Sequence, residues 1–320
     1  MRRHIILTSA LVALALAPAA AQRDAHFSAR SDLVVLDVAV TDRRGGFVGG
    51  LPQTSFQVFE DGRPQDVSFF AQQDAPATVG LLIDSSGSMV EHKDRVIAAI
   101  TTFALASHRE DQFLPLVFNE HITTVLPPER RFTDDAEELR DSLTRSLNAY
   151  GRTAFHDALA YALENLSEAR HERRALVVLS DGGDNASRLS FDDVLKQVQG
   201  SNVVIYSIAL LDPLNRDQNP KALRRLAEAT GGLAFEPKRV SAIGAVLGTI
   251  AADIRSRYTL AYAPANADED GRLRHVSVMA MTADHSRLKV RTRTGYIAAA
   301  QKTALLLAAP SKTTACEGCR

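Results

Sequence analysis

The chain has 320 residues, of which 45% are hydrophobic and 23% are charged. This length suits one large domain or two smaller ones, and the composition is that of an ordinary folded protein. The formal net charge of −1 excludes a strongly basic chain, so we expect neither nucleic acid nor an anionic membrane surface as the general partner.

The first residues have the layout of a secretory signal peptide. Arg2 and Arg3 give a basic start, residues 5–17 are almost wholly apolar, and the small residues before Gln22 fit a cleavage site. The apolar stretch is shorter than the roughly 20 residues that span a bilayer, which favours a signal over a membrane anchor. We therefore expect residues 1–21 to be removed, the protein to be exported to the periplasm or secreted, and no membrane span to remain.

Short alternating segments predict an N-terminal β unit at residues 31–75. Residues 32–41 alternate apolar and polar side chains in their second half, as a half-buried strand does. Residues 56–59 and 67–70 are predicted to pair as a hairpin, because the Asp61-Gly62 dipeptide between them is a strong turn signal.

Between residues 76 and 255 the pattern changes to alternating strands and helices. Apolar strands are predicted at 79–83, 113–118, 175–179 and 203–208, with 122–126 as a hairpin partner, and helices at 91–107, 133–147, 153–169, 191–198, 222–229 and 241–255. Continuous apolar strands that alternate with amphipathic helices are typical of a mainly parallel sheet covered on both faces.

β-structure returns after this region. Residues 258–262, 275–281 and 288–293 alternate again, so we expect residues 256–297 to supply further strands. Because isolated hairpins are only marginally stable, the β segments at the two ends are predicted to form one antiparallel sandwich, with the α/β domain inserted between them.

Residues 298–320 are expected to form a flexible tail. Its pair Cys316 and Cys319 is compatible with a small disulfide or with free thiols.

Oxygen-bearing side chains gather where predicted strands of the α/β domain end. Asp84, Ser86 and Ser88 follow the first strand, Thr153 starts a helix, and Asp181 follows another strand. Ligands of open α/β sheets bind at the carboxyl ends of the strands, so we expect these five side chains at one edge. Hard oxygen ligands suit Mg²⁺ or a similar divalent cation, which prefers octahedral coordination at roughly 2.0–2.1 Å.

The chemistry of these ligands indicates what a cation would do. If the hydroxyl groups of Ser86, Ser88 and Thr153 bind it directly while Asp84 and Asp181 act through waters, the protein ligands in direct contact are neutral. The cation then stays electron-poor and accepts a carboxylate from another molecule. Several directly bound aspartates would neutralise the cation and so weaken its binding of an external carboxylate.

Asp84-Ser85-Ser86-Gly87-Ser88 resembles the Asp-x-Ser-x-Ser motif of von Willebrand factor type A domains. Thr153 and the Asp181 of Ser-Asp-Gly resemble the other members of that family's metal-ion-dependent adhesion site. The resemblance covers about residues 76–255 and implies a Rossmann-like fold that binds Mg²⁺ or Mn²⁺ and captures a carboxylate of a protein partner. The flanking β segments are similar to those of exported, acidobacterial-type proteins of this class.

Other residues near these motifs have simpler interpretations. Asp184 and Asn185 are expected to shape their loop rather than to bind a metal. His156, one turn into the helix after Thr153, is expected to be a packed or solvated histidine.

Two other functions remain as alternatives: a metal-dependent hydrolase, and a structural envelope protein without a metal-mediated ligand. The chain has no G-x-S-x-G elbow, no H-E-x-x-H helix and no P-loop. Phosphatases that use an aspartate nucleophile carry a second aspartate two places on, where this chain has Ser86. We therefore expect the protein not to be an enzyme.

Overall fold

The structure is a computed structural model that describes residues 33–72, 74–86, 93–147, 151–211, 216–266 and 268–298. By its internal contacts the chain divides into Met1–Asp32 and Leu33–Arg320, and all described residues belong to the second part. The predicted signal peptide, nearly all of the predicted tail, Ser88 and both cysteines lie outside the described residues. Within the described ranges, no helix is both long and apolar enough to cross a membrane.

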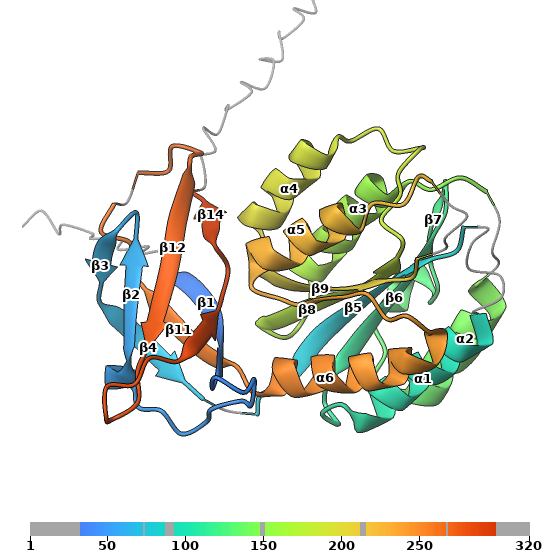
Figure 1. The fold of residues 1–320 in the computed structure, drawn as a ribbon. Coiled ribbons are helices and arrows are strands. Elements are labelled where there is room, and N and C mark those ends of the chain that lie inside the picture. Colours follow the sequence, from blue (N-terminus) through green and yellow to red (C-terminus); the bar gives the residue numbers. More distant parts are fainter. Residues whose placement is uncertain are drawn as a thin grey trace, which may run out of the picture. The chain divides into compact units, whose positions relative to one another are not determined.

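A six-stranded sheet forms the centre of the α/β domain (Figure 1). Its strands, in spatial order, are β10 (Ala234–Phe235), β9 (Val203–Ala209), β8 (Arg173–Ser180), β5 (Ala77–Asp84), β6 (Gln112–Phe118) and β7 (Ile122–Thr124). Neighbouring strands run parallel except β6 and β7, which pair antiparallel. Every residue of β5 is buried, which explains why its sequence is an almost unbroken apolar run.

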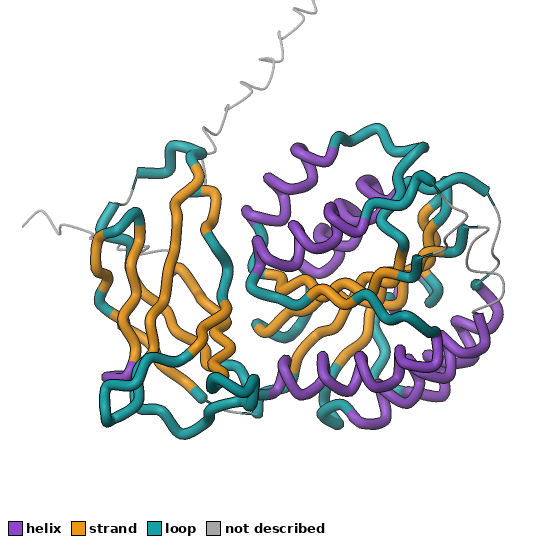
Figure 2. The backbone as a smooth tube through the Cα atoms, in the orientation of Figure 1, coloured by secondary structure: helices purple, strands orange, loops and turns teal. Residues whose placement is uncertain are grey.

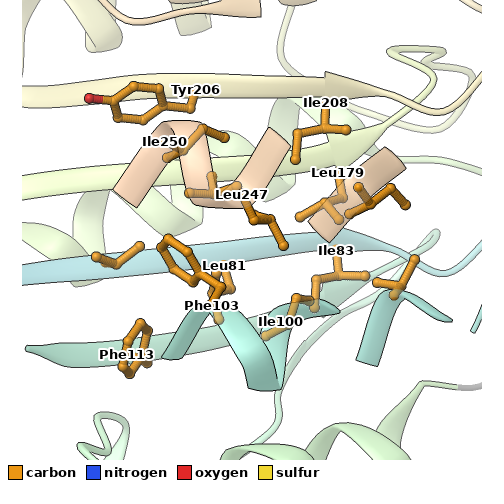
Figure 3. Packing of buried hydrophobic residues seen from close by; sticks show 14 of the residues in the cluster. Leu81, Ile83, Ile100, Phe103, Phe113, Leu179, Tyr206, Ile208, Leu247 and Ile250 are labelled. Carbon is orange, nitrogen blue, oxygen red and sulfur yellow. The ribbon is translucent and has the colours of Figure 1, made fainter. Parts of the chain in front are cut away.

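Helices cover both faces of this sheet, as the backbone tube shows (Figure 2). On one face lie α1 (Lys93–Ala106), α2 (Ala136–Ser146) and α6 (Ile243–Arg255), and on the other α3 (Phe155–Ser167), α4 (Phe191–Gly200) and α5 (Pro220–Thr230). Leu81 and Ile83 of β5 join the first hydrophobic cluster and Leu82 joins the second, because successive strand residues point to opposite faces. Figure 3 shows the first cluster, in which Ile100 of α1 and Leu247 of α6 pack against the strands.

α2 begins three residues later than the sequence pattern predicts. α2 starts at Ala136 because the side chain of Asp135 accepts hydrogen bonds from two N–H groups of the first turn. Thr133, the predicted start, exchanges backbone hydrogen bonds of 2.7 and 3.0 Å with Phe113 of β6 instead. A pairing with the sheet that is distant in sequence therefore decides this boundary.

The β segments from the two ends of the described chain form two four-stranded sheets. One has the order β13 (Lys289–Arg291), β1 (Val34–Thr41), β11 (Tyr258–Tyr262), β4 (Val67–Ala71), and the other β14 (Gly295–Ile297), β12 (Leu273–Ala280), β2 (Phe56–Glu60), β3 (Arg63–Gln65). Each sheet contains strands from before and after the α/β domain, and buried side chains of both sheets form one cluster. The predicted fold class, an α/β domain inserted in an antiparallel sandwich, is confirmed.

One predicted pairing is wrong. The turn at Asp61-Gly62 does form a hairpin, but it joins β2 to the short strand β3, with Glu60 opposite Arg63. β4, which was expected to pair with β2, crosses to the other sheet and pairs with β11. There Phe70 packs in the sandwich cluster and lies opposite Leu260, so tertiary burial rather than the local turn selects the partner of β4.

A buried charge network lies where α6 leads into β11. Asp253 of α6 is fully buried and accepts hydrogen bonds of 2.7 Å from both Arg257 and the hydroxyl of Tyr206; Arg291 of β13 binds it as well. Burial acts to raise the pKa of Asp253, but the charges of Arg257 and Arg291 outweigh it and the pKa is lowered. Arg257 also donates to the carbonyl of Asp37 in β1 at 3.2 Å, so the network joins the α/β domain to the sandwich.

Candidate metal centre

Asp84 is the last residue of β5 and is only 1% exposed. Oδ2 accepts a 2.7 Å hydrogen bond from the hydroxyl of Ser180, and Oδ1 accepts one of 2.8 Å from the N–H of Ser86. Burial raises the pKa of Asp84, the bonds from Ser180 and Ser86 lower it, and the negative charge of Asp181 raises it further. Among the described residues, no basic side chain is one of these main influences on the pKa of Asp84.

Asp181 follows β8, the parallel neighbour of β5, and is 4% exposed. Its Oδ1 accepts the N–H of Gly183 at 2.9 Å, and its carbonyl accepts the N–H of Asn219 at 2.9 Å. Gly182 has a φ of 77°, and a Cβ there would lie 2.5 Å from the carbonyl oxygen of Asn219. Glycine is therefore required for this loop to bring Asp181 to the edge of the sheet.

Thr153 lies two residues before α3 and is 8% exposed. Its N–H donates to Oδ1 of Asn185 at 3.0 Å, and its carbonyl accepts the N–H groups of Asn185 and Ala186, each at 3.0 Å. The loop that carries Thr153 is thus bonded directly to the loop that carries Asp181.

The end of β6 supports two of these loops. The carbonyl of Phe118 accepts the N–H of Ser85, and the carbonyl of Asn119 accepts the N–H of Ala154, both at 2.7 Å. Ser85 precedes Ser86 and Ala154 follows Thr153, so one strand end fixes the backbone beside two predicted ligands.

The remaining residues of the edge have structural partners. Asp184 accepts the N–H of His156 at 2.9 Å and that of Ser187 at 3.2 Å, in agreement with the expected loop-shaping role. Nδ1 of His156 lies 3.1 Å from the carbonyl oxygen of Leu189, and the imidazole packs edge-on against Phe191. His156 is therefore a packed histidine, as its position in the sequence suggested.

The structure thus brings Asp84, Ser86, Thr153 and Asp181 to the carboxyl edge of neighbouring strands, while Ser88 lies outside the described residues. Ser180 was missed by the sequence analysis, although a hydroxyl at the last residue of a strand beside Asp84 was a usable signal.

The donor set fits a hard divalent cation. It combines two buried carboxylates with neutral hydroxyl groups, and oxygen ligands of this kind suit Mg²⁺ or Mn²⁺. In the described part of the chain, no group of three or more histidine, cysteine, aspartate and glutamate side chains could hold a metal ion. Any metal held here would therefore depend on the hydroxyl groups as well as on the carboxylates.

Several solved structures resemble this one. A von Willebrand factor type A protein from Catenulispora acidiphila is 15% identical, with 72% of this chain and 68% of that one covered and a TM-score of 0.47. An aerotolerance-related membrane protein from Bacteroides fragilis is 16% identical, with 56% of this chain and 98% of that one covered and a TM-score of 0.45. The PilB minor pilin from Streptococcus sanguinis is 12% identical, with 58% of this chain and 63% of that one covered and a TM-score of 0.47. Similarity at these identities concerns the fold alone. A search of curated proteins found no match.

The family model of the von Willebrand factor type A domain matches residues 79–249, just over half of the chain. Domains of this family are protein-interaction modules. The matched residues run from β5 to α6 and include most of the central sheet and all the described residues of the candidate metal centre. The chain therefore belongs to the von Willebrand factor type A domain family.

Proposed function

We propose that this protein is exported, binds Mg²⁺ or Mn²⁺ at the candidate metal centre, and through that cation captures an acidic side chain of a protein partner. Ser86, Ser88 and Thr153 bind the cation directly in this proposal, and Asp84 and Asp181 hold it through waters. The cation supplies a positive charge with a coordination position left for the partner.

The observation that carries the proposal is the environment of Asp84. Asp84 is 1% exposed, and its hydrogen-bond donors are a hydroxyl and a backbone N–H. The negative charge of Asp181 acts to raise the pKa of Asp84. Burying a carboxylate costs free energy unless an opposite charge compensates it. A bound cation would supply that charge, and it would relieve the repulsion between Asp84 and Asp181.

Capture of a partner, rather than a purely structural role, is supported by the kind and place of the other ligands. Hydroxyl groups leave the cation its full charge, so a carboxylate from outside remains a strong ligand. Gly151 and Arg152, directly before Thr153, are exposed, so this side of the centre is open to a partner.

Metal titration of the purified protein tests the first step. After treatment with a chelator, the protein should take up Mg²⁺ and Mn²⁺ in isothermal titration calorimetry, and Asp84→Ala should abolish uptake. Glu110→Gln is the matched control, because its side chain is 55% exposed and it lies at the opposite end of the strands. At a hundredfold excess over Kd, the cation should add about 2.7 kcal/mol to the free energy of unfolding. A wild-type protein that takes up neither ion would refute the proposal.

Partner capture is tested with envelope proteins bound to immobilised wild-type protein and to Asp84→Ala, with and without a chelator. Specific binding should require both the cation and Asp84. Once a bound protein is identified, changing its contacting Asp or Glu to the amide should release it. Equal capture with and without the chelator contradicts a metal-mediated role.

Export and the absence of catalysis are part of the same proposal. Sequencing of the protein from the periplasm and the medium should give Gln22 as the first residue, whereas intact protein retained in the cell would contradict export. No residue is assigned a catalytic role.

A further inference from the structure

The loop after β8 carries more than Asp181. Asn185, four residues further along, makes two hydrogen bonds to the backbone of Thr153. The side-chain oxygen of Asn185 accepts the N–H of Thr153, and the backbone N–H of Asn185 donates to the carbonyl of Thr153. With the N–H of Ala186 on the same carbonyl, three hydrogen bonds of 3.0 Å connect the two loops. Both backbone dihedrals of Thr153 are restrained by this arrangement.

Asp184, next to Asn185, acts on the helix that follows Thr153. The N-cap residue of α3, Ala154, has no side chain that could accept a hydrogen bond from the first turn. Asp184 takes that role from the other loop, since its Oδ2 accepts the N–H of His156 at 2.9 Å. Ser187 contributes in the same way, with its hydroxyl oxygen 3.1 Å from the N–H of Asp157.

We infer that Asp184 and Asn185 are positioning residues of the metal centre: they fix the Thr153 hydroxyl relative to Asp181 before any cation binds. This inference rests on the proposed function. Mg²⁺ tolerates little departure from octahedral geometry, so a hydroxyl ligand on a loop must be held within a few tenths of an ångström. The direct bonds between the loops provide that restraint without placing either residue on the cation.

Two substitutions of Asn185 distinguish a positioning role from an effect of charge on the cation. An amide oxygen accepts the N–H of Thr153 without adding negative charge beside Asp181 and Asp184. Asn185→Asp keeps an acceptor at the same place, whereas Asn185→Ala removes it. The added charge of the aspartate attracts both cations, so the readout is the preference for Mg²⁺ over Ca²⁺: loss of this preference in the alanine variant and its recovery in the aspartate variant identify the hydrogen bond as the cause.

The experiment compares cation affinities by calorimetry, with Mg²⁺ and Ca²⁺ alone as the probes. Removing a partner that orients a ligand typically weakens metal binding about 10- to 100-fold, and we expect this for Asn185→Ala with Mg²⁺. Ca²⁺ accepts flexible geometry, so its affinity should fall much less and the preference for Mg²⁺ should narrow. Asn185→Asp should keep the wild-type preference.

Asn266→Ala is the matched control, because the side-chain oxygen of Asn266 also accepts a backbone N–H at 3.0 Å, that of Asp268 in the sandwich. It should leave both affinities unchanged. Equal losses for Mg²⁺ and Ca²⁺ in Asn185→Ala, or no loss at all, would overturn the inference.

A metal-free measurement separates this inference from the proposed function. Hydrogen exchange of the Thr153 amide should be at least tenfold faster in Asn185→Ala than in the wild type, with the core amides of β5 unchanged. If the wild type binds no cation, the proposed function fails whatever the exchange shows. If it binds Mg²⁺ and the Thr153 amide exchanges equally in both proteins, only the positioning role fails.

Discussion

The hydroxyl of Ser180 donates a 2.7 Å hydrogen bond to Oδ2 of Asp84, so the last residue of β8 holds the carboxylate at the last residue of β5. Both residues are buried, at 0% and 1% exposure. Ser180→Ala leaves Oδ2 without this donor and the N–H of Gly182 without its acceptor, and we expect the metal-free protein to lose about 1–3 kcal/mol of unfolding free energy in urea titrations.

Ser167→Ala is the control for this change. Its hydroxyl also donates one hydrogen bond, 2.6 Å long, to the carbonyl of Glu164, but it lies on the exposed side of α3. We expect its effect to stay within about 0.5 kcal/mol. Equal effects of the two serine changes would show that the carboxylate of Asp84 does not depend on Ser180.

Gly182→Ala should disturb the loop that carries Asp181. The new Cβ would lie 2.5 Å from the carbonyl oxygen of Asn219, and the φ of 77° is itself strained for alanine. We expect a loss of about 1–3 kcal/mol in unfolding free energy, together with weaker Mg²⁺ binding in calorimetry because Asp181 moves with the loop.

Gly50→Ala separates these two causes. Gly50 has nearly the same φ, 76°, but nothing lies within 4 Å of the position of its Cβ. This variant carries only the backbone strain, so it should cost less stability and leave Mg²⁺ binding unchanged. A Gly182→Ala protein that behaves like Gly50→Ala would mean that the clash with Asn219 is relieved without moving Asp181.

The sequence was sufficient for the architecture because the hydrophobic pattern reports burial. The apolar run of β5 is buried throughout, and the alternating β segments at both ends form the sandwich. The pattern could not predict which strands pair when the partners are distant in sequence. The dipeptide Asp61-Gly62 fixes a turn but not the length of the returning strand, so β3 ends at Gln65 and β4 joins the other sheet.

At the candidate centre, the sequence motifs led to residues that the fold gathers at one edge, because the carboxyl ends of parallel strands lie together. Their supporting contacts were less accessible. Asn119 bonds to Ala154 through its main-chain carbonyl, and a backbone contact of this kind leaves no trace in residue type. The side-chain contacts of Ser180 and Asn185 depend on loop conformations that no local pattern specifies.

Removing the charge of Asp253 should be among the most destabilising single changes in the interior. Asp253→Asn leaves Arg257, which is 1% exposed, without its counter-charge, and breaking a buried ion pair in this way costs about 3–5 kcal/mol. Urea unfolding at pH 7 measures it. The comparison is Asp74→Asn, which breaks a pair with Arg255 whose side chains are 44% and 45% exposed, and which should cost at most about 1 kcal/mol.

The pH dependence of stability provides a separate test of the Asp253 network. The arginines hold the pKa of this carboxyl below its ordinary value, about 3.9 in an unfolded chain, so the unfolded state binds a proton more readily. The stabilisation is therefore complete above about pH 4 and is lost as the pH falls through the lower pKa of the folded state. Urea unfolding of wild type and Asp253→Asn from pH 6 to pH 2 should show the difference between them shrinking below about pH 4.

The difference between these two proteins is the informative quantity, because other carboxyls act in the opposite direction. Burial raises the pKa of Asp37, Asp84 and Asp111, so those groups favour the folded state as the pH falls. Subtracting the two pH profiles removes the contributions of Asp84 and Asp111, since both proteins contain them. Asp37 stays coupled to the network, because the charge of Arg257 acts to lower the pKa of Asp37. A difference that stays constant down to pH 2 would mean that the ionised form of Asp253 does not stabilise the junction between α6 and the sandwich.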